Sequence, residues 1–253
     1  MKPFQPDFKG ARVQASPNCG ARVECDGPDI LLLHYTGMPS AEGALSWLCN
    51  PESQVSSHYF VHEDGRIVQM VPEGMRAWHA GKSSWAGVSD INSRSIGIEI
   101  ANPGHPAGLP PFPDKQIAAV VELCRDCGER WQIPAERVLG HSDVAPIRKI
   151  DPGENFPWGR LNAAGIGHYV EPSPIAGGRF FQRGDSGQPV EALQSMLSLY
   201  GYDVEITGEF CARTEGVVAA FQRHFRPVLV DGIADASTIE TLHRLLSSLP
   251  RFA

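Results

Sequence analysis

The chain has 253 residues, of which 42% are hydrophobic and 20% are charged. These proportions are ordinary for a globular protein, and the length favours one medium-sized domain followed by a smaller one. The formal net charge of -7 argues against a broad electrostatic contact with nucleic acid or with an anionic membrane. No run of apolar residues is long enough to predict a transmembrane segment.

The first 160 residues alternate strand patterns with helix patterns. Residues 30–35 form an apolar run typical of a buried strand, and residues 41–50 show the spacing of a short amphipathic helix. The segment SSHYFVHEDGRIVQMV predicts two strands joined by a tight turn at Glu63-Asp64-Gly65, because glycine readily adopts the positive φ of such turns.

The second half of this region continues the alternation. A strand is predicted at residues 95–101, with isoleucine at every second position and Glu99 on the opposite face. A long helix is predicted at residues 114–131, and a short strand at residues 137–140 leads directly to His141. These patterns predict an α/β domain with a central mixed β-sheet flanked by helices.

Cys124 and Cys127 form a Cys-x-x-Cys pair inside the long helical pattern. Such a pair is compatible with redox chemistry or with zinc binding, but no second pair accompanies it. We therefore expect two core thiols on one face of the helix. The six cysteines of the chain do not suggest a disulfide framework in a protein of this length.

The pattern changes after the first domain. Residues 161–178 contain prolines and glycines without apolar periodicity and are interpreted as a linker. Residues 179–253 form a second domain with three short helical patterns, which predict a small three-helix bundle. These patterns cover residues 190–200, 214–225 and 237–249.

A weak internal repeat runs through the second domain. Gly208 is followed six residues later by Thr214, and Gly232 is followed six residues later by Thr238. In both copies a glycine turn precedes a threonine that we expect to cap the next helix.

The candidate functional residues are well separated in the sequence: His34, Glu99, His141, Lys149 and Asp151. Two imidazoles and one carboxylate are the protein ligands of many catalytic zinc sites, which keep a fourth position for water. Alone, His34 could be a satisfied core residue and Asp151 could simply open a turn. In an extended segment, however, Lys149 and Asp151 would point to the same side. A buried Glu99 would also need a partner, so the set predicts a metal-assisted hydrolase.

Several segments around these residues resemble those of a known family. They are SPNCGAR, LLLHYTG, VSSHYFVHEDGRIVQMV, RAWHAGKSSW, SIGIEIAN and LGHSDVAPIRKIDPGENFPW. In this order they look like the zinc-dependent type-2 N-acetylmuramoyl-L-alanine amidases, which are related to the peptidoglycan recognition proteins. The resemblance covers about residues 15–160 and implies a mixed sheet with the zinc in a surface groove.

The resemblance implies a role for each candidate. His34, His141 and Asp151 are expected to bind Zn²⁺. Glu99 is expected to be the catalytic acid and base, and Lys149 to stabilise the oxyanion.

Other residues of the matching segments are candidates for substrate contacts. His58 and His79 are expected to line the groove, with packing, or for His79 support of a metal ligand, as the alternatives. Trp78 and Trp85 are compatible with sugar contacts and equally with packing in the wall.

The second domain has its own resemblance. The segments QRGDSGQPVEALQSMLSLYGY, GEFCARTEGVVAAFQ and VDGIADASTIETL look like the peptidoglycan-binding domain of many cell-wall hydrolases. A stabilising appendage is the alternative. A domain that binds the polymer would raise the local concentration of the enzyme on it.

The expected function is zinc-dependent hydrolysis of the amide bond between N-acetylmuramic or anhydromuramic acid and L-alanine in peptidoglycan or muropeptides. The alternative is a non-catalytic peptidoglycan-binding receptor or scaffold. A glycosidase would need a second carboxylate beside Glu99, and the sequence offers no clear one.

The sequence gives opposing indications about the compartment. The first residues show no signal-peptide pattern, which slightly favours the cytoplasm, whereas a polymer-binding domain favours the periplasm or the cell wall. A monomer is expected.

Overall fold

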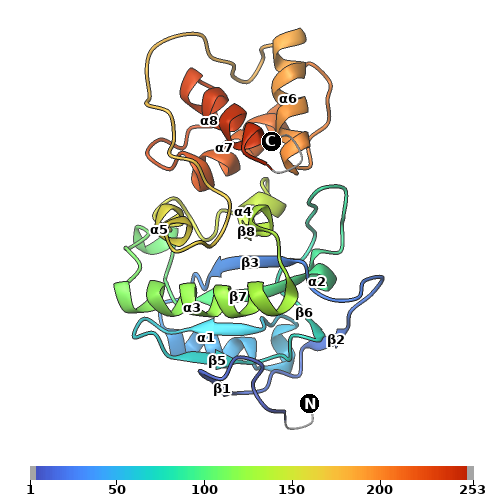
Figure 1. Ribbon diagram of the computed structural model, residues 1–253, viewed down its shortest axis with the longest axis vertical. Coiled ribbons are helices and arrows are strands. Elements are labelled where there is room, and N and C mark those ends of the chain that lie inside the picture. Colours follow the sequence, from blue (N-terminus) through green and yellow to red (C-terminus); the bar gives the residue numbers. More distant parts are fainter. Residues whose placement is uncertain (1–3, 250–253) are drawn as a thin grey trace.

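The computed structural model describes residues 4–249, and the first domain is built on a six-stranded mixed sheet (Figure 1). Its strands are, in spatial order, β1 (Ala11–Val13), β5 (Ile67–Gln69), β4 (Tyr59–Val61), β7 (Ser95–Ile100), β3 (Ile30–Tyr35) and β8 (Val138–Gly140). Neighbouring strands are parallel except β4 and β5, which form the expected hairpin with Gly65 at φ 89°. The predicted mixed sheet is therefore confirmed. A separate antiparallel pair joins β2 (Cys19–Ala21) and β6 (Met75–Ala77).

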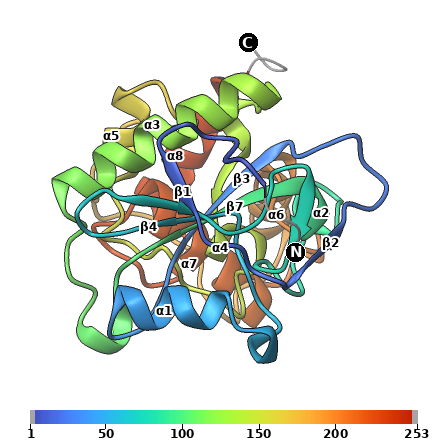
Figure 2. The ribbon, with the colours of Figure 1, turned by 90° about the horizontal axis from the view of Figure 1, so that it is seen from below.

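Helices cover both faces of this sheet. Those of the first domain are α1 (Ala41–Leu48), α2 (Ile91–Arg94), α3 (Asp114–Trp131), α4 (His141–Val144) and α5 (Trp158–Ala163), with 3-10 turns at Pro51–Ser53, His105–Ala107 and Ala135–Arg137. Figure 2 shows α3 on one face and α1 on the other. The isoleucines of β7 pack against α3, and Cys124 and Cys127 lie in the same core as free thiols. The opposite face of the sheet is thus left for the polar side chains His34 and Glu99.

Helix α3 is fixed to the domain by a buried carboxylate. Glu73 is 1% exposed and accepts hydrogen bonds from Tyr59 Oη at 2.6 Å and Trp131 Nε1 at 2.5 Å. It also forms an ion pair with Arg130. Burial alone would raise the pKa of Glu73, but the hydrogen bonds from Arg130, Tyr59 and Trp131 lower it below its ordinary value.

The second domain contains the three expected helices, α6 (Gln188–Tyr200), α7 (Ala212–Phe225) and α8 (Ala236–Ser247). The expected first boundary, after residue 160, falls inside α5. Residues 164–178 have no helix or strand, but this stretch is not free in solution. Ser173 is buried and binds α8 through its backbone, donating to Thr241 Oγ1 and accepting from Ser237 Oγ.

The internal repeat is real, but its threonines are not helix caps. The residues at the N-cap positions are Cys211 for α7 and Asp235 for α8. Thr214 and Thr238 lie inside the helices and are buried. The expected capping role was therefore wrong, because each helix begins two residues before its threonine and its N-cap residue lies three residues before it.

A glutamine from the preceding helix explains the repeat. Gln194 Oε1 accepts the backbone N–H groups of Thr207 and Gly208, while its Nε2 donates to Thr214 Oγ1 at 3.0 Å. Gln222 repeats this arrangement in the second copy with the turn at Gly232 and with Thr238. Each glutamine thus hydrogen-bonds both to the backbone of the glycine turn and to the threonine in the first turn of the next helix.

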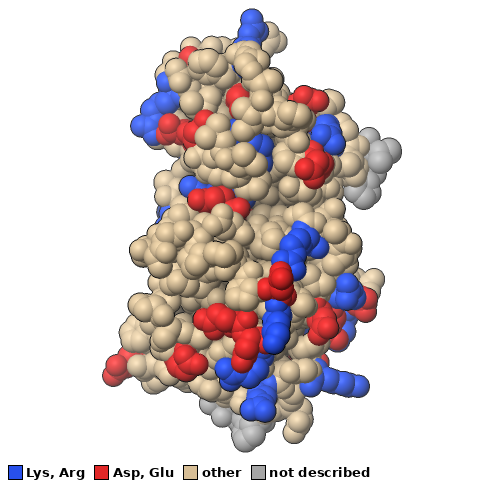
Figure 3. All heavy atoms as spheres, turned by 90° about the vertical axis from the view of Figure 1, so that its left-hand side faces the viewer, with Lys and Arg blue, Asp and Glu red and all other residues tan. Residues whose placement is uncertain are grey.

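The two domains share one apolar core. Leu32, Trp85 and Val144 of the first domain belong to the same buried cluster as Tyr202 and Phe221 of the second. The space-filling view shows the second domain seated directly on the first, with acidic and basic side chains mixed on the visible face (Figure 3). In the described part of the chain no helix is long and apolar enough to cross a membrane.

The glutamate of the α3 cluster gives a first prediction. Replacing Glu73→Gln should lower the free energy of unfolding by about 2–4 kcal/mol, because Arg130 then keeps only its more exposed partner Asp126 and an amide N–H group faces other donors. Urea denaturation monitored by circular dichroism measures the change. Glu129→Gln on the exposed face of α3 is the matched control, and an equally small effect of both substitutions would contradict the role of Glu73.

Candidate metal centre

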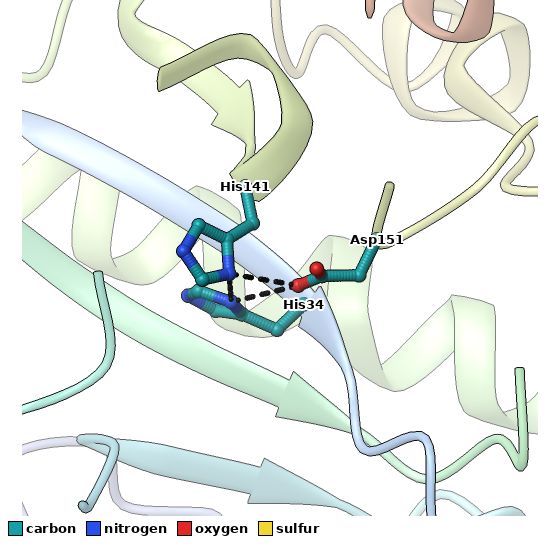
Figure 4. A group of neighbouring side chains, drawn as sticks. All are labelled: His34, His141 and Asp151. Atoms are coloured by element: carbon teal, nitrogen blue, oxygen red, sulfur yellow. Dashed lines mark hydrogen bonds and ion pairs between the residues drawn. The ribbon is translucent and has the colours of Figure 1, made fainter. Parts of the chain in front are cut away.

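Three side chains from distant parts of the sequence meet at one point (Figure 4). His34 is near the carboxyl end of β3, His141 begins α4 directly after β8, and Asp151 follows the turn after α4. The Nδ1 atoms of the two histidines are 2.9 Å apart, and each is 3.0 Å from Asp151 Oδ2. All three side chains are buried. The predicted triad is thus assembled by the parallel pairing of β3 with β8.

The hydrogen bonds behind His34 fix which of its nitrogens carries the proton. Ser95 Oγ is 2.6 Å from the carbonyl oxygen of Ile91, which can only accept, so the hydroxyl donates there. Ser95 Oγ then accepts from His79 Nε2 at 3.3 Å. His79 Nδ1 consequently has no proton and accepts from His34 Nε2 at 3.0 Å.

The ring of His141 also carries its proton on Nε2. Its Nε2 lies 3.0 Å from the carbonyl oxygen of Ala80 and donates to it. Asn92 Oδ1 accepts the backbone N–H groups of His79 and Ala80, so one side chain holds the segment that supports both metal-ligand candidates.

The Nδ1 atoms of both histidines therefore present lone pairs to the point where Asp151 presents a carboxylate oxygen. Burial, followed by the influence of His141, lowers the pKa of His34 to about 4, so the ring is neutral near pH 7. Three lone pairs at this spacing, without a proton between them, fit a bound cation. Among the described residues this is the one group of at least three such side chains that could hold a metal ion.

Glu99 lies beside the triad because of strand register. It is paired with His34 across β7 and β3, on the face away from α3. Its Oε2 is buried without a hydrogen-bond partner in the described part of the chain. Burial, with a further contribution from Asp151, raises the pKa of Glu99 to about 8, and Lys149 opposes this shift.

The triad and Glu99 line a groove with a volume of about 440 Å³. Lys149 and His79 line it as well, and so does Trp78. The predicted residues all line this groove except His58 and Trp85.

His58 does not reach the groove. It is fully buried, its Nδ1 accepts the N–H group of Gly97 at 2.9 Å, and its Nε2 donates to the carbonyl oxygen of Met75 at 3.0 Å. Both ring nitrogens are therefore occupied by backbone groups of β7 and β6. The expected substrate contact of His58 is corrected to a structural role.

Trp85 also lies elsewhere. It is 2% exposed and packs against Tyr202 of the second domain, with ring centroids 4.9 Å apart. Of its two alternatives, packing is the one that the structure supports.

Two further residues of the groove were missed by the sequence analysis. Trp47 on α1 lines it and is 47% exposed, and a large aromatic residue at an exposed helix position was the available signal. Arg148 also lines it, and its Nη2 donates to the carbonyl oxygens of Ala80 and Lys82. Arg148 adjoins Lys149 in a segment that was already singled out.

Both domains have relatives among known proteins. Residues 25–154 match the family model described as N-acetylmuramoyl-L-alanine amidase, and residues 186–242 match that of a putative peptidoglycan binding domain. The chain is 40% identical over 233 residues to the N-acetylmuramoyl-L-alanine amidase AmiD of Escherichia coli strain K12, covering 86% of this chain and 82% of AmiD. It is 34% identical over 172 residues to the 1,6-anhydro-N-acetylmuramyl-L-alanine amidase AmpD of the same strain, covering 60% of this chain and 90% of AmpD.

Solved structures extend the likeness to three dimensions. The complex of E. coli AmiD with anhydro-N-acetylmuramic acid-L-Ala-D-gamma-Glu-L-Lys matches with a TM-score of 0.74 and 38% identity, over 89% of this chain and 91% of AmiD. AmpDh3 of Pseudomonas aeruginosa matches with a TM-score of 0.71 and 27% identity over 99% of both chains. His34, His141 and Asp151 all lie within residues 25–154, and the chain belongs to the N-acetylmuramoyl-L-alanine amidase family.

Proposed function

We propose that this chain hydrolyses the amide bond between the lactyl group of N-acetylmuramic or anhydromuramic acid and the L-alanine of the stem peptide, using Zn²⁺ held by His34, His141 and Asp151. Its family membership supports the reaction, and its likeness to an AmiD structure holding an anhydromuramyl peptide supports the substrate class. The observation that carries the proposal is the buried, unpartnered oxygen of Glu99 beside three converging lone pairs.

The choice of metal rests on the ligand set. Two imidazoles and one carboxylate suit zinc, and three protein ligands leave a position for water or substrate. A zinc ion bound here would polarise the amide carbonyl and lower the pKa of a water molecule toward about 7. His79 and Ala80 would keep the two imidazoles in the tautomer that binds it.

Glu99 is the proposed general base and general acid. An amide needs both, because water must lose a proton as it attacks and the leaving amine must gain one. Glu99 lies next to the triad and has a free oxygen to accept this proton and return it to the nitrogen. In the metal-free site burial raises the pKa of Glu99, and a cation bound beside it would lower that pKa again, toward the range in which a carboxylate accepts a proton from water.

Lys149 is the proposed partner of the negative charge that develops on the carbonyl oxygen. Its side chain lines the groove together with Glu99 and the triad and brings a positive charge there. A cation at this place favours the negatively charged tetrahedral state over the neutral amide.

The shape of the groove suits a substrate that is part sugar and part peptide. The groove has an apolar surface from Met38, Trp47 and Leu48 and positive charge from Arg148 and Lys149. Aromatic rings stack on the faces of sugars, and cations attract the carboxylates of stem peptides.

The Glu99→Gln variant tests the reaction. It should lower kcat by about 10²–10⁴-fold while the protein still binds one zinc, because Glu99 is a proton carrier and not a ligand. The measurement is mass spectrometry of products from purified sacculi and from soluble anhydro-muropeptides, with bound zinc determined in parallel. Glu122→Gln on the exposed face of α3 is the control.

The same assay separates the alternatives. Release of free stem peptides should stop with a chelator and return with zinc. Full activity of Glu99→Gln would contradict the mechanism, and absence of product from the wild-type protein on both substrates would favour the receptor function.

The Lys149→Met variant tests oxyanion stabilisation. Loss of one such group should lower kcat by about 10²–10³-fold with little change in KM, because the charge it meets exists only in the transition state. Steady-state kinetics on a soluble anhydro-muropeptide gives both constants. A change confined to KM would instead make Lys149 a substrate-binding residue.

The pKa of Glu99 predicts the pH dependence of stability in the metal-free protein. The folded pKa of about 8 lies above the ordinary value of 4.5, so the folded state holds a proton that the unfolded state releases. Stability should therefore fall as pH rises from about 4.5 to about 8, by up to about 3–5 kcal/mol from this group.

Glu99→Gln removes the titration and provides the comparison. With chelator present, the free energy of unfolding of this variant should exceed that of the wild-type protein by an amount that grows between pH 5 and pH 8. Urea denaturation at a series of pH values measures it. Parallel pH profiles of the two proteins would show that Glu99 is ionised in the folded state throughout this range.

A further inference from the structure

The second domain hydrogen-bonds a buried carboxylate, Asp143, that lies two residues from the proposed metal ligand His141. Asp143 lies on α4, two residues after His141, and is 0% exposed. Its Oδ2 accepts the backbone N–H group of Gly140 at 2.7 Å. This bond closes the first turn of α4 around His141.

Two side chains of the second domain complete the hydrogen bonding of Asp143. Tyr202, which follows α6, donates its hydroxyl to Asp143 Oδ1 at 2.7 Å. His224 on α7 donates Nδ1–H to Asp143 Oδ2, also at 2.7 Å, and its ring stacks on Trp158. Burial and the adjacent carboxylate raise the pKa of Tyr202 well above its ordinary value, so the phenol keeps the proton that it donates.

A second contact reaches the other side of His141. The loop that carries Ala80, whose carbonyl accepts from His141 Nε2, continues to Trp85 and Ala86. Ala86 N–H donates to the carbonyl oxygen of Gly201 at 2.8 Å, and a Cβ on Gly201 would lie 2.5 Å from the Trp85 ring. Residues of the second domain therefore hold both the helix that bears His141 and the loop that orients it.

These contacts matter because α4 is a single turn of four residues. A helix of this length gains little stability from its own hydrogen bonds, so its position depends on the side chains packed around it. A buried carboxylate that loses a donor keeps an unsatisfied oxygen and shifts to find another partner. Here any such shift moves the backbone that carries His141.

We propose that the second domain is a structural part of the metal centre: Tyr202 and His224, acting through Asp143, position His141 as a metal ligand. This inference rests on the proposed function, since it requires that His34, His141 and Asp151 bind zinc. It gives the domain a role that does not involve the polymer.

Matched full-length variants test the proposal. Tyr202→Phe removes the donor to Asp143 but keeps the ring, whereas Thr214→Val removes a buried hydroxyl whose hydrogen bond with Gln194 stays inside the second domain. His224→Leu removes the second donor, and His224→Asn restores an N–H group near the same place. The readouts are the zinc dissociation constant by chelator competition and amide hydrogen exchange at residues 141–145. Activity on a soluble anhydro-muropeptide is measured beside them.

Tyr202→Phe and His224→Leu should weaken zinc binding by about 3–10-fold and speed exchange in α4, a smaller loss than the about 10–100-fold expected for a group bonded directly to a metal ligand, because both act through Asp143. His224→Asn should bind zinc more tightly than His224→Leu, and Thr214→Val should bind it as the wild-type protein does. Unchanged zinc affinity in Tyr202→Phe, or an equal loss in Thr214→Val, would overturn the proposal.

The wild-type protein separates this result from a failure of the proposed function. If it neither binds zinc nor releases stem peptides, the proposed function is wrong and the positioning role falls with it. If it does both while Tyr202→Phe matches it in zinc affinity and exchange, only the positioning role is wrong.

Discussion

Three lone pairs face one point in this protein, on His34 Nδ1, His141 Nδ1 and Asp151 Oδ2, and much of the surrounding structure holds them there. Such an arrangement is unfavourable without a cation, because nothing between the three atoms offsets their repulsion. The backbone carbonyls of Ile91 and Ala80 determine where the ring protons lie, since each can only accept a hydrogen bond. Ile91 acts on His34 through Ser95 and His79, and Ala80 acts on His141 directly. A proton pattern fixed in this way at the protein interior leaves all three lone pairs available to a cation.

The sheet supplies the remaining geometry through register. Parallel pairing sets His34 beside Glu99, and the alternation of side chains sends the isoleucines of β7 to α3 and Glu99 to the groove. A shift of one residue in β7 would bury Glu99 under α3 and expose isoleucine to the groove. Gly97 on the same strand is equally constrained, because a Cβ there would lie 2.6 Å from the His79 ring. The apolar core and the polar site are thus two consequences of one strand pairing.

The sequence correctly predicted the elements that depend on local residue patterns. The buried strand at residues 30–35 and the helix at residues 114–131 follow from periodicity, and both have the expected bounds. The triad followed from the types of its residues and from family resemblance. His58 was misjudged because its partners are backbone groups of Gly97 and Met75, which leave no trace in side-chain pattern. Asp143 was not singled out, since its partners are 59 and 81 residues away and belong to another domain.

The shared core changes how the two domains can cooperate. A binding domain on a free tether raises the local concentration of its enzyme but leaves the orientation of the groove on the polymer open. Here Trp85 is inserted against Gly201 and Val144 belongs to the same cluster as Phe221, so the two domains have one fixed orientation. A polymer held by the second domain would then meet the groove in a restricted set of poses, which favours the reactive one when the geometry matches. The same rigidity gives substitutions in α6 or α7 a packed route to the His34–His141–Asp151 cluster that involves no contact with substrate.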